Sequence, residues 1–301
     1  MSIASLLVDV LGPVVVLVAI GAVVGPRIGV EAGSLSKLAY WILGPAFMFA
    51  SLYAAELDGA LIAKLVAAAL AGMVIAGGGA WTVMRIAGAG YGERGATALT
   101  SSYGNVGNAG LAICAFALGD EILPIASVLM LTVNSAGLVF GVGVAAARTT
   151  SRLAALGRAV TAPMTVAAWL AIAANVGDVS LPLVAERPLE LVAGALIPVM
   201  LLTLGMQLVS TGLPSFDRAL GVSIVAKLAV APLAAGVVIR SLGVGGDPAA
   251  AVIIQSAMPP AVFCALLALE HDFETDRVTS AVVASTMVSI VTLPVVLAIT
   301  T

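Results

Sequence analysis

Charged residues are scarce in this chain of 301 residues, as are cysteine and histidine. Lys, Arg, Asp and Glu together make up 10% of the chain, which has two cysteines and one histidine. Soluble globular proteins carry about 25% charged residues. Here 61% of the residues are hydrophobic and the mean hydropathy is +1.16. This composition excludes a soluble enzyme, gives no reason to expect a nucleic-acid partner, and predicts a protein embedded in the lipid bilayer.

The scarcity of reactive side chains narrows the chemistry further. Cys114 and Cys264 both lie in apolar segments, so they offer neither a disulfide framework nor the spacing of a metal site, and small apolar core residues are the simplest interpretation. The chain has no His-Glu metal motif, no Gly-x-Ser-x-Gly elbow and no pair of Asp residues at membrane depth. We therefore expect no metal, no cofactor and no enzymatic activity.

What the chain does have is long apolar segments. A helix needs roughly 20 apolar residues to cross the hydrocarbon core. Barrel strands alternate in polarity, whereas these segments are apolar all round, so we predict an all-α membrane protein. The first segment lacks a basic region before it, so we expect a spanning helix and not a signal peptide. The ten predicted spans are 6–24, 35–55, 61–87, 95–118, 122–147, 160–176, 189–209, 216–242, 249–269 and 278–299.

The basic residues divide unevenly between the two sides of this arrangement. Nine of them lie in connections on one side, three lie on the other side, and Lys227 falls inside a span. Lys and Arg are enriched in cytoplasmic loops. This predicts that both termini are extracytoplasmic and that the protein lies in the cytoplasmic (inner) membrane.

The two halves of the chain also resemble each other, at an offset of about 150 to 153 residues. For example, Leu43–Met48 corresponds to Leu196–Leu201. Five spans per half is an odd number, so the second half must enter the membrane from the opposite side. We therefore predict two inverted repeats, 1–147 and 160–301, joined by a cytoplasmic linker at 148–159.

Two polar runs interrupt predicted spans at corresponding places in the halves. They are Ser101–Gly110, with the sequence SSYGNVGNAG, and Gln255–Pro260, with the sequence QSAMPP. Glycine and proline break helices, and a broken helix survives in lipid only where protein or a wet cavity satisfies its backbone. Matching breaks in the two halves of a transporter mark its binding site.

These residues carry a resemblance to a known family. The chain is similar to bacterial members of the auxin efflux carrier family, which is related in fold to plant PIN carriers and bile acid sodium symporters. The most specific motifs are Gly104–Leu111 and Ala257–Val262, with weaker support from Ala195–Pro198 and from Lys227–Leu233. The sequence departs from the family pattern at Ala112 and at Phe263–Cys264, so the substrate is not carried over.

The resemblance implies an architecture and a mechanism. Spans one, two, six and seven would form a scaffold, and spans three to five and eight to ten a mobile transport domain that works as an elevator. Broken spans four and nine would cross, and Asn108 would be the binding position that transfers best. The residues also permit a different interpretation of Asn108, as the N-cap of the second half-helix.

The free ends of broken helices bind ions, because N-terminal N–H groups attract anions and C-terminal carbonyls attract cations. Pro259 and Pro260 would shape the backbone, while Gln255 and Ser256 would either satisfy freed carbonyls or line the cavity. The candidate substrate-binding residues are Asn105, Gly107, Asn108, Gln255, Ser256, Pro259, Pro260 and Lys227.

Lys227 lies in an apolar span, where a charge costs about 2.5 to 3.5 kcal/mol. It would attract an anionic substrate, exchange a proton or take the place of a bound cation, or else snorkel to the cytoplasmic interface. Polar residues of spans five and ten are candidates for coupling to a proton or a sodium ion, although such side chains are also ordinary packing groups. The candidates for coupling are Thr132, Asn134, Ser285 and Lys227.

No Asp or Glu lies deep in spans four, five, nine or ten, and sodium–proton exchange needs a buried carboxylate. The sequence therefore favours a secondary transporter of a small organic anion, a carboxylate for which auxin-like acids and dicarboxylates are two candidates. The alternative is a membrane-embedded sensor that binds a ligand without moving it. Gly- and Ala-rich scaffold helices are also compatible with a homodimer.

Overall fold

The fold was analysed in a computed structural model that describes all residues except 1–5, 56–57, 146–151, 211–213 and 215. Most of the described residues are helical, and among them there is no β-strand beyond one isolated bridge. The first half contains η1 (Leu6–Leu11), α2 (Gly12–Val24), η2 (Gly25–Ile28), α3 (Ala32–Leu38), η3 (Ala39–Leu43), α4 (Gly44–Tyr53), α5 (Gly59–Ile86), α6 (Tyr91–Ser102), η4 (Val106–Gly110), α7 (Leu111–Leu118), η5 (Asp120–Ile122) and α8 (Leu123–Ala145). The second half contains α9 (Arg152–Val160), α10 (Pro163–Val176), α11 (Leu183–Gly194), α12 (Leu196–Ser210), α13 (Arg218–Val225), η6 (Ala226–Val230), α14 (Ala231–Ser241), α15 (Gly246–Ser256), α16 (Val262–Glu270) and α17 (Thr275–Thr300).

Seven helices among the described residues are long and apolar enough to cross a membrane. The all-α membrane architecture is therefore confirmed. The seven are Val8–Ile28, Ala32–Tyr53, Gly59–Ile86, Asp120–Gly141, Leu183–Val209, Arg218–Ser241 and Thr275–Thr300. The other three predicted spans are the two interrupted ones and 160–176, whose helix α10 is short because it begins at Pro163. The count of ten stays a prediction.

Three boundaries differ from those predicted. The span expected to begin at residue 189 begins at Leu183, because Pro188 lies inside α11 without ending it. The span expected to begin at 216 starts its helix at Arg218, where the Asp217 carboxylate caps the backbone N–H of Leu220. Part of the predicted linker is helical, since α9 begins at Arg152, while the linker residues 148–151 lie outside the described part of the chain.

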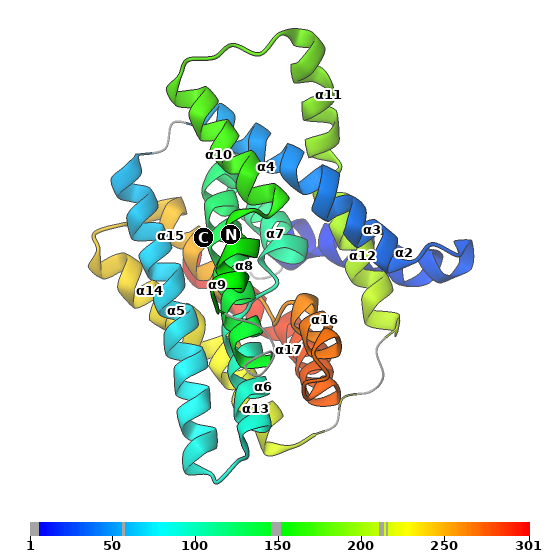
Figure 1. Cartoon of the computed structure of the whole chain (residues 1–301), viewed down its shortest axis with the longest axis vertical. Helices are drawn as coiled ribbons and strands as arrows, with labels where there is room; N and C mark the ends of the chain where they lie inside the picture. The colour runs from blue at the N-terminus through cyan, green and yellow to red at the C-terminus, as the bar shows by residue number, and fades with distance from the viewer. Residues whose placement is uncertain (1–5, 56–57, 146–151, 211–213, 215) are drawn as a thin grey trace.

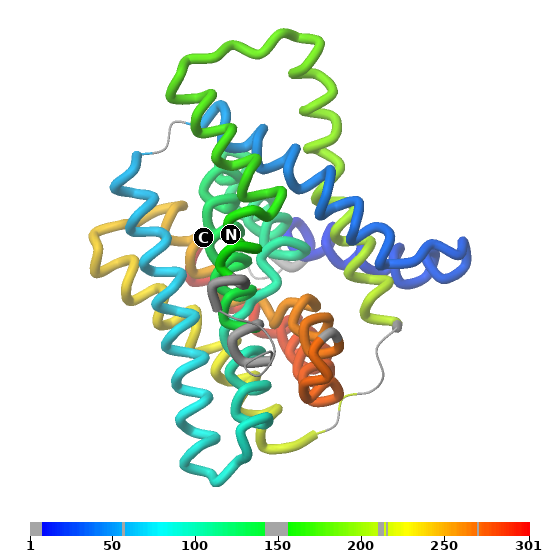
Figure 2. Tube along the Cα trace, viewed as in Figure 1, coloured from blue at the N-terminus to red at the C-terminus, as the bar shows by residue number. Residues whose placement is uncertain are grey.

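The helices form two groups that can be followed in the tube drawing (Figure 2). Helices α2, α3 and α4 pack with α10, α11 and α12. Helices α5 and α6 pack with α13, α14 and α17, and α15 lies between α5, α8 and α17. The long helix α5 runs down one side of the second group (Figure 1).

Helices α2 and α12 approach each other closely. A Cβ at Gly21 would overlap the backbone of Leu202, and a Cβ at Gly205 would overlap the backbone of Val18. Small residues at such contacts let two backbones approach, which is how helices associate in lipid without a hydrophobic driving force. The two glycines therefore set the distance between α2 and α12.

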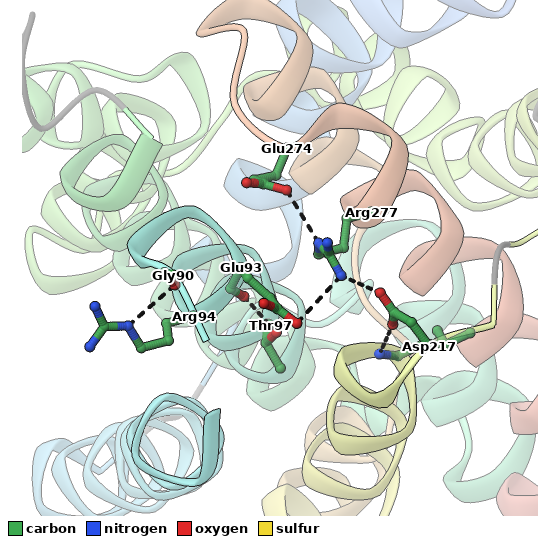
Figure 3. A network of polar contacts seen from close by, with 8 residues as sticks. Gly90, Glu93, Arg94, Thr97, Asp217, Glu274 and Arg277 are labelled. Atoms are coloured by element: carbon green, nitrogen blue, oxygen red, sulfur yellow. Dashed lines mark hydrogen bonds and ion pairs between the residues drawn. The ribbon is translucent and has the colours of Figure 1, made fainter. Parts of the chain in front are cut away.

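Arg277 joins three helices of the second group at one end (Figure 3). Its guanidinium contacts Glu274 at 3.2 Å and Glu93 of α6 at 3.7 Å, and it also pairs with Asp217 before α13. These side chains are partly exposed, so each pair contributes little alone. Together they tie the first turns of α6, α13 and α17.

We expect Gly205→Ala to lower stability by about 1 to 3 kcal/mol, because the added methyl has no space at the α2–α12 contact. The matched control is Gly78→Ala in α5, where nothing lies within 4 Å of the added Cβ. That change should raise stability by about 0.5 to 1 kcal/mol through helix propensity. Thermal unfolding in detergent distinguishes them, and equal midpoints for Gly205→Ala and the native protein would contradict the close approach.

Candidate functional site

Both interrupted segments are broken helices, and in each of them the chain between the two helical pieces is extended. Helix α6 ends at Ser102, Tyr103 has φ −92° and ψ 101°, and η4 begins at Val106. Helix α15 ends at Ser256, and α16 begins at Val262 after the two prolines. Pro259 and Pro260 cannot donate backbone hydrogen bonds, so a helix cannot continue through them unstrained.

The structure brings the two breaks together as a short antiparallel bridge. The backbone N–H of Asn105 donates to the carbonyl of Pro259 at 2.8 Å, and the N–H of Ala261 donates to the carbonyl of Tyr103 at 2.9 Å. Gly104 and Pro260 face each other between these bonds. Each break thereby satisfies backbone groups that the other leaves open, as burial in lipid requires.

Lys227 reaches this bridge from a third helix. It lies in the π-helical turn η6, is 2% exposed, and donates from Nζ to the carbonyl oxygen of Ser256 at 3.0 Å. That carbonyl is at the C-terminal, negative end of α15. The side chain is directed into the protein, so the structure does not support the snorkelling alternative.

Because Gly104 has no side chain, the ammonium of Lys227 can approach the bridge closely. A Cβ at Gly104 would lie 2.9 Å from Lys227 Nζ and 3.4 Å from the Met258 carbonyl oxygen. Among the buried residues that the structure describes, Lys227 is the only one with a formally charged side chain. A lone cation therefore lies beside the bridge without a carboxylate partner.

Tyr103 is a site residue that the sequence reasoning missed. Its hydroxyl donates to Asn134 Oδ1 at 3.2 Å, its backbone carbonyl lies 3.8 Å from the thiol of Cys264, and its ring packs edge-on against Phe263. Gly137 of α8 leaves room for the ring. The sequence did contain a signal for this role, namely a tyrosine at a helix break, because a phenol hydroxyl in lipid needs a hydrogen-bond partner.

The amide residues of the first break sit at the start of its second half. Asn105 is at the N-cap position of η4 and makes no side-chain cap. Gly107 and Asn108 are half-buried inside η4, so Asn108 is not the N-cap that the alternative interpretation requires. Its side chain forms no hydrogen bond with another described residue, which leaves the amide available to a ligand.

Gln255 and Ser256 have different surroundings. Gln255 is 2% exposed, and its Nε2 lies 3.5 Å from the carbonyl oxygen of Ala126 in α8. Its Oε1 is buried without a partner and abuts Gly110. Ser256 is half-buried and contributes its carbonyl to Lys227. Gln255 thus holds α15 to α8 and η4 more than it lines an open cavity.

The candidate coupling residues do not form one cluster. Asn134 is tied to Tyr103 at the bridge. Thr132 donates its hydroxyl to the Val128 carbonyl of its own helix and lines a groove toward α9 and α10. Ser285 is fully buried with no partner for its hydroxyl. Among the described residues, no group of three or more His, Cys, Asp or Glu has metal-binding geometry.

A comparison with protein families supplies the identification. The family described as membrane transport proteins matches residues 145–297, just over half of the chain. The chain belongs to this family. It is a family of transporters and not of enzymes, and the resemblance to auxin efflux carriers is thereby confirmed. The matched region includes Lys227 and the second break.

One relative supports the same conclusion over a shorter stretch. A protein of Methanothermobacter thermautotrophicus named as an uncharacterized transporter is 29% identical over 111 residues, which is 37% of this chain and 37% of that protein. The alignment therefore spans little more than a third of the relative. The similarity to this relative covers only a segment, so the cargo of the present membrane transport protein has to be inferred from its own site.

The Tyr103–Asn134 hydrogen bond should couple α8 to the bridge. We expect Tyr103→Phe and Asn134→Ala each to lower stability by about 1 kcal/mol. The double variant should lose less than the sum, because both changes remove the same bond. Thermal unfolding of the four proteins measures the coupling, and strict additivity would show that the bond contributes nothing.

Proposed function

We propose that the protein is a secondary transporter or uniporter of a small organic carboxylate in the cytoplasmic membrane, and that the cargo binds where the two breaks meet. The observation that supports this most is the contact between Lys227 Nζ and the Ser256 carbonyl oxygen, at 3.0 Å. It places a positive charge at a site that, among the described residues, has no buried negative side chain.

The charge balance at the bridge favours an anion. Four half-helix ends meet here, and each carries roughly half an elementary charge. The C-terminal end of α15 is compensated by the ammonium of Lys227, whereas the N-terminal ends of η4–α7 and α16 have no anionic partner among the described residues. A carboxylate would complete this balance, and backbone N–H groups at helix starts bind one without a dedicated cationic side chain.

Residues of both breaks would then contact the cargo or position it. Asn108 would donate its free amide to the carboxylate, with the backbone N–H of Gly107 beside it, whereas the backbone N–H of Asn105 is already bonded to the Pro259 carbonyl. Pro259 and Pro260 hold the second break open and keep its carbonyl toward the first. The absence of a buried Asp or Glu among the described residues also argues against cation–proton exchange.

The packing supports an elevator movement of one helix group against the other. Several helix contacts have a counterpart in which each helix is replaced by the corresponding helix of the other half. The contact of α2 with α12 corresponds to that of α10 with α4, and the contact of α8 with α15 corresponds to that of α17 with α6. This pattern is expected of two inverted repeats with five spans each. The scaffold would be α2–α4 with α10–α12, and the transport domain would be α5–α8 with α13–α17.

Several parts of the proposal rest on the sequence. The ten spans come from the apolar segments, and the extracytoplasmic position of both termini comes from the distribution of basic residues. The small residues of the scaffold are compatible with a homodimer. Coupling to a proton or a sodium ion through Thr132, Asn134, Ser285 or Lys227 stays a prediction. Because Lys227 already occupies a carbonyl end that would attract a cation, we favour transport that does not depend on sodium.

Uptake of labelled carboxylates into proteoliposomes tests the function. A screen of mono- and dicarboxylates, with aromatic acids included, identifies a cargo, and equilibrium binding is then measured. Asn108→Ala and Lys227→Met should each raise the dissociation constant by about tenfold or more, because a hydrogen bond to a charged group contributes about 1.5 to 3 kcal/mol.

The control is Thr286→Val, since the Thr286 hydroxyl donates to Val282 of its own helix at 2.7 Å. It should bind and transport like the native protein. Unchanged binding in both Asn108→Ala and Lys227→Met would reject the bridge as the site. Binding that depends on both residues without any uptake would favour the sensor over the transporter.

A further inference from the structure

A groove of about 930 Å³ lies outside the bridge, between helices of the two groups. Its lining residues come from α5, α6, α8, α9 and α10. The volume is at the upper end of ligand pockets, which measure roughly 300 to 1,000 Å³. The lining residues are Trp81, Tyr91, Leu131, Thr132, Ser135, Ala136, Val139, Phe140, Leu156, Ala159, Val160, Thr165 and Trp169.

The groove is apolar and opens outward. Trp169 is 62% exposed, Leu156 and Val160 are each 52% exposed, and Tyr91 is 50% exposed. Apolar side chains this open on a spanning protein face lipid and not water. The occupant is therefore expected to have a long hydrocarbon part.

One end of the groove lies at the depth of lipid headgroups. Trp81 is near the end of α5 and Tyr91 begins α6, so both adjoin the short connection between the two helices. Their rings meet edge to face with centroids 5.4 Å apart. Helix α5 has 28 residues, or about 42 Å at 1.5 Å per residue, and must emerge from a hydrocarbon core about 30 Å thick. Trp and Tyr are enriched at that interface.

A basic side chain caps this aromatic pair. The guanidinium carbon of Arg94 lies 5.3 Å from the centre of the Trp81 ring, and its Nε donates to the Gly90 carbonyl at 3.3 Å. Figure 3 shows the rest of the guanidinium directed away from Glu93 and Arg277. Among the described residues, Arg277 pairs with three carboxylates, whereas Arg94 pairs with none.

We infer that the groove binds an anionic phospholipid, with the phosphate on Arg94 and an acyl chain along α8 and α9. The planar guanidinium suits a phosphate, because it presents paired N–H groups to two oxygens. Basic pockets between spanning helices bind anionic headgroups in this way. This site is distinct from the bridge, and its occupancy does not depend on the proposed transport function.

Native mass spectrometry of the detergent-purified full chain tests the inference, with phosphatidylglycerol and phosphatidylcholine of identical acyl chains as probes. We expect phosphatidylglycerol to bind at least about tenfold more tightly, and Arg94→Gln to remove most of that preference. The matched control is Arg240→Gln, because Arg240 is an exposed arginine at the end of α14, a helix that contributes no residue to the groove, whereas Arg94 contacts the ring of the groove residue Trp81.

Ala136→Phe is a second variant, which fills the groove and leaves Arg94 in place. It should lower binding of both lipids while the thermal unfolding midpoint stays near that of the native protein. Equal binding of the two lipids by the native protein, or an unchanged preference in Arg94→Gln, would overturn the inference. A change of oligomeric state in Ala136→Phe with unaltered lipid binding would also overturn it, since the groove would then be an interface between two copies.

Discussion

Two interrupted helices that satisfy each other's backbone groups are the constraint on which this structure depends. An unpaired N–H or carbonyl in hydrocarbon costs several kcal/mol, and each break opens several such groups at once. The backbone hydrogen bonds from Asn105 to Pro259 and from Ala261 to Tyr103 satisfy some of these open groups. Neither break is stable alone, so the helices that carry them, α6–α7 and α15–α16, must be held in one body.

The same constraint concentrates polar groups at the bridge. Helix ends that would be solvated in a soluble protein are retained here in the interior, and one of them is compensated by Lys227. The proposed anion site rests on this cation and on the helix starts beside it, which have no anionic partner among the described residues. The ion pairs of Arg277 hold α6, α13 and α17 in register at one end, so the body that carries this polarity is tied together away from the site as well.

The sequence predicts the helical class, the position of both breaks and the presence of a lysine inside an apolar span, because these follow from composition and from glycine and proline at fixed places. Whether that lysine is buried or reaches the interface is left open by the sequence. The breaks can be predicted from the sequence, because a helix interrupted in lipid requires other parts of the protein to satisfy its backbone groups. The sequence does not predict the hydrogen bond between Tyr103 and Asn134 or the groove lined by Trp81, because both depend on which helices become neighbours. Two helix starts differ from the predicted ones: Leu183 lies six residues before the predicted 189, because Pro188 is tolerated inside α11, and Arg218 lies two residues after the predicted 216, because Asp217 caps α13.

The most direct test of the central claim is a distance across the bridge by solid-state NMR in lipid. With ¹³C at proline carbonyls and ¹⁵N at asparagine, no labelled pair is directly bonded, since no asparagine follows a proline in the chain. The 2.8 Å bond from the Asn105 N–H to the Pro259 carbonyl predicts carbon–nitrogen dephasing at about 4 Å, given a C=O bond of about 1.23 Å. The dephasing should vanish in Asn105→Gln, which removes the label and keeps the backbone. No dephasing in the native protein would mean that the two breaks do not meet.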